Sequence, residues 1–224
     1  MHKNIILVAE TGSDIPADLA KELGVWLVPM HVQMGEITLD DGAFPPEDVC
    51  AYYDRTGKCP TTSASTPYDF TKIFDENEID AVIHFAAYKA VGESVAEPLM
   101  YYRNNLDSFI NILEASKKQG GCNVLFSSSA TVYGETDQLP VTESSPRQTA
   151  TSPYGNTKQI CEDILRDSVK AYAGVKGIAL RYFNPIGAHP SALIGELPRG
   201  VPNNLVPFIT QTAIGKRECL SVFG

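Results

Sequence analysis

The chain has 224 residues, of which 43% are hydrophobic and 20% are charged, and its net charge is −9 at neutral pH. This length and composition are typical of a globular protein that can bury a sizeable core. The negative charge is spread along the chain, which argues against nucleic acid and anionic membranes as partners, because both require clustered Lys and Arg.

The first forty residues predict a strand, a helix and a strand, followed by a hairpin. Apolar residues 5–9 form a buried strand. A helix follows, which Asp14 can cap and which Gly24 ends. Residues 25–34 are interpreted as one long second strand, and residues 36–42 as its return strand.

Two further helices are predicted before residue 77. The first begins at the prolines of residues 45–46 and ends at Gly57. The second follows a polar loop within TTSASTPYDFTKIF, residues 61–74, and has Thr66 as its cap.

From Ile79 onward, strands and helices alternate along the chain. The predicted elements are a strand at 79–87, a helix at 99–121, a strand at 123–129, a helix at 152–174, a strand at 177–183, a helix at 204–217 and a strand at 219–223. This alternation is typical of a Rossmann-like α/β fold, a mostly parallel sheet with helices on both faces.

The cysteines and the amino-terminal residues indicate the cellular compartment in which the protein is expected. The five cysteines are widely spaced, and the sequence has no CxxC pair or Cys/His cluster, so we expect reduced, buried thiols and no metal site. The opening MHKNIILVAE lacks a small-residue cleavage pattern, and no stretch reaches the roughly 20 apolar residues that span a bilayer. We therefore expect a cytoplasmic protein that does not enter a membrane.

The pentapeptide YGNTK carries the most informative chemistry. Tyr154 and Lys158 are four residues apart on a predicted helix, so their side chains share one face. A nearby ammonium stabilises a phenolate, which a tyrosine needs in order to take a proton from a hydroxyl.

Three other segments are predicted to lie near this pair. Ser127, Ser128 and Ser129 end a buried strand, and the segments 84–89 and RYFNP, residues 181–185, also follow strands. Ligands bind beyond the carboxyl ends of parallel strands. Taken singly, these residues could have only a structural role, with the serines ending a strand and Tyr154 packing between helix and sheet. Taken together, three strand ends in order predict a site.

From about Asn77 to Gly224 the chain resembles the UDP-glucose 4-epimerase family of extended short-chain dehydrogenases/reductases. The matching runs, in the family's order, are AVIHFAAYKAVGESV, FSSSATVYG, SPYGNTK, LRYFNPIGAHP and GVPNNLVPF. The resemblance implies NAD as the cofactor and a UDP-sugar as the substrate.

The resemblance also implies roles for individual residues. Tyr154 would be the base at the sugar 4-hydroxyl, Lys158 would tune it and bind the nicotinamide ribose, and Ser129 would share the proton-transfer hydrogen bonds. Hydride would pass from the sugar C4 to NAD, which would leave a 4-keto intermediate. This intermediate would rotate in the site and then take the hydride back. Positions that match those lining the cofactor are Phe85, Ala86, Lys89, Asn104, Ser127, Tyr182 and Phe183, and positions around the UDP-sugar are Asn184, Asn204, Leu205 and Phe223.

Two features of that family are missing from the sequence. The family begins with a strand and GxxGxxG, whose glycines let the backbone approach a pyrophosphate. Here the corresponding residues 10–18 are ETGSDIPAD, with Gly12 as their single glycine and with the bulky Ile15 and Pro16. The family also continues well past residue 224, so we expect a sheet truncated at its carboxyl end and an impaired or inactive enzyme.

Residues 1–76 resemble instead the amino-terminal part of the DegV-type fatty-acid-binding family. The matching runs are ETGSDIPADLAKELGVWLVPMHVQMGE, LDDG and PPEDVCAYYDRTGKCPTTSASTPYDF. In this resemblance, Thr62 and Ser63 lie in the loop whose hydroxyls hold a fatty-acid carboxylate. From the residues alone, a solvated turn before a helix cap explains the same loop equally well.

The sequence therefore predicts a chimera of a DegV-like segment, 1–76, and an epimerase-like segment, 77–224, joined near residues 74–80 in one sheet. Three functional hypotheses follow: an NAD-dependent UDP-sugar 4-epimerase core, a fatty-acid-binding module, and a folded chimera without activity. Apolar surface left uncovered at the carboxyl end would favour a homo-oligomer.

Overall fold

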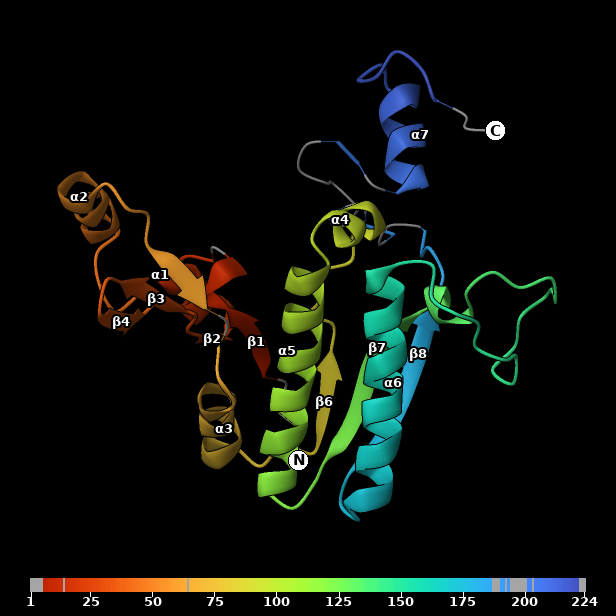
Figure 1. Cartoon of the computed structure of the whole chain (residues 1–224), viewed down its shortest axis with the longest axis horizontal. Coiled ribbons are helices and arrows are strands. Elements are labelled where there is room, and N and C mark those ends of the chain that lie inside the picture. The colour runs from red at the N-terminus through yellow and green to blue at the C-terminus, as the bar shows by residue number, and fades with distance from the viewer. Residues whose placement is uncertain are drawn as a thin grey trace.

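The computed structural model describes residues 6–13, 15–63, 65–186, 190–191, 193, 201–202 and 204–221 (Figure 1). The strands in this part of the chain form three sheets. The first is the parallel pair β1 (Leu7–Glu10) and β2 (Val25–Val28). The second is antiparallel, in the order β4-β3-β5, and consists of β3 (His31–Met34), β4 (Ile37–Asp40) and β5 (Thr61–Ser63). The third is parallel, in the order β6-β7-β8, and consists of β6 (Ala81–His84), β7 (Asn123–Ser129) and β8 (Lys176–Tyr182).

The third sheet and two long helices form a Rossmann-like α/β unit. The helices α5 (Pro98–Lys118) and α6 (Pro153–Ala171) run side by side along one face of this sheet (Figure 1). Phe109 of α5 and Cys161 of α6 pack against Val124 and Phe126 of β7, and all four are buried. This apolar layer between helices and strands is the main core of the described chain.

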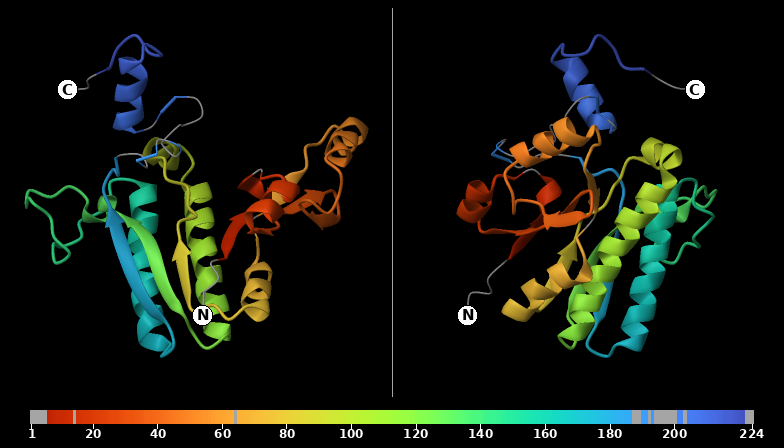
Figure 2. Two further views of the ribbon diagram at one scale, coloured as in Figure 1. Left: turned by 180° about the vertical axis from the view of Figure 1, so that it is seen from behind. Right: turned by 60° about the vertical axis from the view of Figure 1, so that its left-hand side comes forward.

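The opposite face of the same sheet is open in the described part of the chain (Figure 2). Ile83, Leu125 and Ile178 lie opposite one another across β6, β7 and β8 and point to this face. The Ile83 and Ile178 side chains are 60% and 61% exposed. An uncovered row of aliphatic side chains on a parallel sheet is unusual, because such sheets are normally buried on both faces.

The predicted second strand, 25–34, is two strands instead of one. Pro29 follows β2, and because it has no N–H it cannot continue the ladder that pairs β2 with β1. After this break β3 joins the antiparallel sheet, where it pairs with β4 and β5. The polar loop predicted around residues 61–63 is therefore the edge strand β5.

The predicted helix ends agree well with the structure. In α1 (Ala17–Leu23), Gly24 adopts the left-handed conformation at the C-cap, and Gly57 does the same for α2 (Glu47–Thr56). The Thr66 cap of α3 (Pro67–Glu76) is confirmed as a capping box with Asp69. Asp14, the predicted cap of α1, lies outside the described residues, and Pro16 is the N-cap.

The amino-terminal segment meets the rest of the chain through a helix pair. Phe70, Ile73 and Phe74 of α3 pack against α5 in the buried cluster that holds Phe109, and β2 contributes Val28 to it. Among the described strands β1 pairs with β2 and not with β6, so the expected joined sheet does not form. Packing of α3 against α5 takes the place of strand pairing at this junction.

Two shorter helices and two 3₁₀ turns complete the described structure. They are the short helix α4 (Val91–Ala96), the 3₁₀ turns η1 (Thr11–Ser13) and η2 (Ala130–Tyr133), and α7 (Leu205–Ala213). The helix predicted at 204–217 is thus shorter. Residues 219–221 of the last predicted strand are not in a strand, and residues 222–223 lie outside the described part.

Two further expectations concern the thiols and the membrane. Cys122 and Cys161 are buried, but Cys50, Cys59 and Cys219 are exposed, so the expectation of buried thiols is wrong for three of the five. None of the helices in the described residues has the length and apolar character required to cross a bilayer.

Candidate active site

The site is built at the carboxyl end of β7, where three consecutive serines are held in three different ways. The Ser127 carbonyl oxygen accepts a hydrogen bond from Lys158 Nζ at 2.8 Å. The Ser128 hydroxyl donates to Glu162 Oε1 at 2.6 Å. The Ser129 hydroxyl accepts from the Thr131 backbone N–H at 3.2 Å and so caps the turn η2.

The first turn of α6 is fixed against this strand end. The Ser152 hydroxyl caps the helix by accepting from the Gly155 N–H at 3.1 Å, and Pro153 occupies the first turn. A Cβ atom at Gly155 would lie 3.4 Å from Thr131 Cβ, so the helix start packs closely on η2. Because the helix begins here, Tyr154 and Lys158 fall one turn apart on neighbouring positions of its surface.

Lys158 is a buried cation in an aromatic setting. The residue is 4% exposed, and its Nζ lies 4.9 Å from the ring centroid of Phe126 and 5.8 Å from that of the half-buried Tyr154. Burial lowers the pKa of Lys158 to about 8. The amine is therefore still largely protonated at neutral pH and lies beside the Tyr154 ring.

His84 ends β6 beneath this cation. Its ring lies 5.2 Å from the centroid of Phe109 and 6.1 Å from that of Phe126. Burial, with a smaller contribution from the charge of Lys158, lowers the pKa of His84 to about 4. His84 is consequently neutral at physiological pH and acts as part of the aromatic core under the site.

The loop after β6 is attached to both long helices by one buried amide. Asn105 of α5 accepts from the Tyr88 N–H at 2.8 Å, donates to the Tyr88 carbonyl at 3.0 Å and donates to Thr157 Oγ1 of α6 at 3.1 Å. Tyr101 adds a hydrogen bond from the Ala90 N–H to its hydroxyl at 3.0 Å. Together these contacts fix the segment 85–90 relative to α6.

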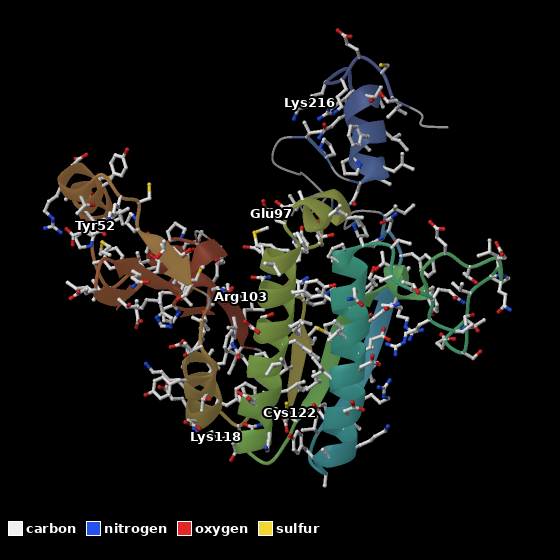
Figure 3. All side chains as sticks on the ribbon, viewed as in Figure 1. Tyr52, Glu97, Arg103, Lys118, Cys122 and Lys216 are labelled. Atoms are coloured by element: carbon white, nitrogen blue, oxygen red, sulfur yellow. The ribbon has the colours of Figure 1, made fainter. Side chains whose placement is uncertain are left out.

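The strands of the third sheet run upward in Figure 1, so their carboxyl ends lie at the Glu97 end of α5 and their amino ends near Cys122 (Figure 3). The structure brings most of the predicted residues to this upper end. They are Ser127 and Ser129 on β7, Tyr154 and Lys158 on α6, Phe85, Ala86 and Lys89 after β6, Asn104 on α5, and Tyr182, Phe183 and Asn184 at and after the end of β8. Asn204 and Leu205 lie at the start of α7, and Phe223 lies outside the described residues.

Comparison with known proteins places this geometry in a family. The sequence matches the NAD dependent epimerase/dehydratase family over residues 47–221. The chain belongs to this family. The third sheet, the serine-rich end of β7 and the Tyr154–Lys158 pair all fall within the matched region.

Similar proteins of the epimerase/dehydratase family carry a consistent name. UDP-glucose 4-epimerase 2 of Arabidopsis thaliana is 56% identical over 153 residues, which are 68% of this chain and 43% of that protein. UDP-glucose 4-epimerase of Bos taurus is 44% identical over 199 residues, 88% of this chain and 57% of that protein. The chain thus spans about half the length of the curated relatives it matches.

Solved structures of the family agree in fold. The crystal structure of UDP-glucose 4-epimerase from Bifidobacterium longum, a complex with NAD+ and UDP, has a TM-score of 0.66 and 36% identity, and the match covers 96% of this chain and 64% of that one. The enzyme from Brucella ovis, in complex with NAD, has a TM-score of 0.66 and 38% identity over 70% of this chain and 48% of that one.

The turn after β1 stands where the family has its phosphate loop, and the space beside its single glycine is filled by another part of the chain. A Cβ atom at Gly12 would lie 2.5 Å from Met30 Sδ, so the space beside this glycine holds a methionine side chain. The Met30 N–H also donates to Thr11 Oγ1 at 3.0 Å. This turn therefore has a single glycine with a methionine side chain packed on it, in place of the glycine-rich backbone that cradles a pyrophosphate.

Thr62 and Ser63 lie apart from the epimerase-like residues, on the exposed edge strand β5. They pair with Val32 and His31 of β3. The His31 ring lies between two carboxylates, 3.0 Å from Asp40 and 3.1 Å from Asp69. The next two hydroxyls of the chain are engaged within the protein, because Ser65 donates to the Pro29 carbonyl and Thr66 caps α3.

Several residues that complete the site were not singled out from the sequence: Tyr101, Asn105, Glu162 and Arg181. Asn105 is adjacent to the predicted Asn104, whose amide donates to it at 3.0 Å. Glu162 follows Tyr154 and Lys158 at the same four-residue spacing, and this repeat was the available signal. Among the described residues, no group of three or more His, Cys, Asp or Glu side chains is placed to hold a metal ion.

Proposed function

We propose that this chain is the catalytic core of an NAD-dependent epimerase that acts at C4 of a UDP-sugar. The observation that carries the proposal is the buried ammonium of Lys158, held on the Ser127 carbonyl one helical turn from Tyr154. Relatives named UDP-glucose 4-epimerase and a neighbour solved with NAD+ and UDP support the same chemistry.

In this proposal Tyr154 takes the proton from the sugar 4-hydroxyl. The Lys158 ammonium stabilises the phenolate form of Tyr154 by its charge, because the surrounding aromatic rings exclude water and leave the charge poorly screened. Ser129 shares the hydrogen bonds along which the proton moves. NAD, when bound, supplies reversible acceptance of a hydride from the sugar carbon.

The binding residues follow from the resemblance to the epimerase family, and those at the carboxyl ends of the strands are in keeping with it. We assign NAD to Phe85, Ala86, Lys89, Asn104, Ser127, Tyr182 and Phe183, its nicotinamide ribose to Lys158, and the UDP-sugar to Asn184, Asn204, Leu205 and Phe223. The pyrophosphate has no glycine-rich loop to lie on, since Gly12 packs on Met30. We therefore expect weak NAD binding and impaired turnover.

The first test is to denature the purified protein and identify the small molecules it releases by mass spectrometry. Release of NAD or NADH supports the proposal and justifies assaying conversion of UDP-galactose with and without added NAD. In that assay, activity that Tyr154→Phe abolishes would establish the function. No bound dinucleotide, together with no turnover at saturating NAD, would refute it.

A second candidate is a carboxylate site at Thr62 and Ser63, which would make residues 1–76 a DegV-like segment of a chimera with 77–224. What favours it is that both residues are exposed on β5 and that Ser63 lies opposite His31 in the strand register. Release of a fatty acid in the same experiment, lost in a Thr62→Ala, Ser63→Ala variant, would support this function in place of the epimerase.

Two properties of the whole protein complete the proposal. We place the protein in the cytoplasm, where its three exposed thiols would stay reduced. We also propose a homo-oligomer, because exposed aliphatic rows such as that of Ile83 and Ile178 commonly mark association surfaces.

A further inference from the structure

Glu162 lies one turn beyond Lys158 on α6, and its side chain is only 9% exposed. Its carboxylate takes part in three close hydrogen bonds. It accepts from the Ser128 hydroxyl at 2.6 Å, from Arg181 Nε at 2.9 Å and from Arg181 Nη2 at 2.8 Å. Arg147 contributes a more distant charge, with Nη1 3.8 Å from Glu162 Oε2.

The hydrogen-bond partners of Glu162 belong to two strands of the site. Ser128 of β7 and Arg181 of β8 face each other in the strand register, so Glu162 bridges a cross-strand pair. The Arg181 guanidinium in turn lies 4.8 Å from the ring centroid of Tyr133 in η2. One carboxylate thus joins α6 to both strands and, through Arg181, to the turn that Ser129 caps.

Two hydrogen bonds to β7, one helical turn apart on α6, fix the helix more completely than one. Lys158 contacts the carbonyl of Ser127, and Glu162 contacts the side chain of the next residue, Ser128. The packing of Gly155 on η2 and the Asn105–Thr157 hydrogen bond already hold α6 in place, and the Lys158 and Glu162 contacts add two polar contacts that join the helix to successive residues at the end of β7. Tyr154 lies on the turn before these two and is oriented by the same constraint.

A stability role alone explains this arrangement poorly. Burying a charged pair costs desolvation that its attraction often only balances, so such pairs are weak evidence of stabilisation. A bidentate contact to Arg does, however, define a geometry closely. The network is therefore better suited to orienting the helix than to strengthening the fold.

We propose that Glu162 is a positioning residue that sets α6 against β7 and thereby holds Lys158 and Tyr154 at the end of that strand. The inference rests on the proposed function for its purpose. The structural effect that it predicts, the burial of the Lys158 amine at the end of β7, can be tested without cofactor or turnover.

The test follows the pH titration of the Lys158 ¹³Cε resonance in the full-length protein, assigned by its absence in Lys158→Arg. Wild type should titrate near pH 8, because the amine is buried. Glu162→Gln keeps one acceptor oxygen for Ser128 but loses the charged bidentate contact with Arg181, so we expect α6 to be held less firmly on β7, Lys158 to become more solvated and the midpoint of its titration to rise by about one unit or more. The matched control is Asp163→Asn, which removes the same charge from the next residue, where it pairs with Arg147 and Arg166 and not with β7.

The direction of the shift separates positioning from simple charge removal. Loss of a nearby carboxylate by itself would lower the titration midpoint of the Lys158 amine. Greater exposure of the amine to solvent would raise that midpoint. A rise in Glu162→Gln with no change in Asp163→Asn supports the proposal. No shift, a downward shift, or equal rises in both variants would overturn it.

A second variant covers the case in which Glu162→Gln does not fold. Ser128→Ala removes one hydrogen bond and keeps the Glu162–Arg181 pair, so a smaller rise is expected there, and an unchanged midpoint would count against the proposal. Turnover of the wild type is measured separately. Inactive wild type with the expected titrations would refute the epimerase function and leave the positioning role of Glu162 intact.

Discussion

The Lys158 ammonium donates to the Ser127 carbonyl at 2.8 Å, and this bond joins the second turn of α6 to the last residues of β7. The amine has the backbone of a strand as its hydrogen-bond partner and aromatic rings on two sides. It keeps its charge available to a neighbouring group instead of neutralising it in an ion pair. Tyr154 lies one turn away, and its ring centroid is 5.8 Å from the amine.

Tyr154→Phe is expected to reduce turnover of UDP-galactose by about 10²–10⁴-fold in any preparation that is active with NAD, because it removes the proton acceptor. The measurement is a coupled assay of UDP-glucose formation at saturating NAD. The matched control is Tyr53→Phe on α2, an exposed tyrosine outside the site. Equal rates in wild type and Tyr154→Phe would show that another group takes the proton.

Lys158 should lower the stability of the fold at neutral pH. Its pKa falls from 10.5 to about 8 on burial, so between these values the unfolded chain binds the proton more tightly, and the free energy of unfolding rises with pH by about 3 kcal/mol across that window. Lys158→Met removes this dependence. Urea denaturation of both proteins at pH 7 and pH 10 should therefore show their stability difference changing in favour of wild type as pH rises. A constant difference would contradict the burial of a charged amine.

His84 gives a second pH dependence on the acid side. Its pKa is lowered from 6.5 to about 4, so protons bind the unfolded chain preferentially between these values, and about 3 kcal/mol of stability present above pH 6.5 is lost as pH falls through 4. His84→Gln should be less sensitive than wild type over this range. Thermal denaturation of the two proteins at pH 7 and pH 4.5 measures the difference, and parallel losses would refute the role of His84.

The cap of α6 should contribute to stability locally. Ser152→Ala removes the hydrogen bond from the Gly155 N–H and is expected to cost about 1 kcal/mol of the free energy of unfolding. Thr151→Ala, at the exposed preceding residue, is the matched control and should cost far less. Equal effects of the two substitutions in urea denaturation would show that the cap is not used.

The exposed aliphatic row on the third sheet leads to a test of self-association. Ile178→Lys places a charge in the row formed with Leu125 and Ile83 and should lower the oligomeric mass measured by sedimentation. Val169→Lys, on the helix-covered side of the molecule, is the comparison variant. A monomeric wild type, or equal behaviour of the two variants, would exclude this face as an interface.

Local signals in the sequence predicted much of this structure, and long-range contacts account for the rest. The cap at Thr66 and the glycine ends of α1 and α2 depend on a few neighbouring residues, so their patterns were sufficient. Pro29, which ends β2, can be read in the sequence. The pairing of β3 with residues 37–40 and 61–63 cannot, because no local pattern specifies it. Edge pairing of this kind depends on tertiary context.

The same distinction applies to the candidate site. The Tyr154–Lys158 pair was predictable from helical spacing, and the serines were predictable from their place at a strand end. Glu162 shares that spacing, but its use depends on Arg181 and Ser128 meeting across two strands. Asn105 is similar. Its side-chain amide bonds to Tyr88, 17 residues earlier in the chain, and to Thr157, 52 residues later. Contacts of that separation follow from the fold and not from a motif.

Attachment of the amino-terminal segment through α3 and α5 has a mechanical consequence. Phe70, Ile73 and Phe74 form an apolar contact with α5 that does not depend on the covalent link across residues 77–80. A chain cut within that link would leave two fragments with complementary apolar surfaces, and the fragments should remain bound and copurify. The protein can thus be handled as a split pair whose reassembly reports on the α3–α5 interface, while the buried cation at the end of β7 stays entirely within the larger piece.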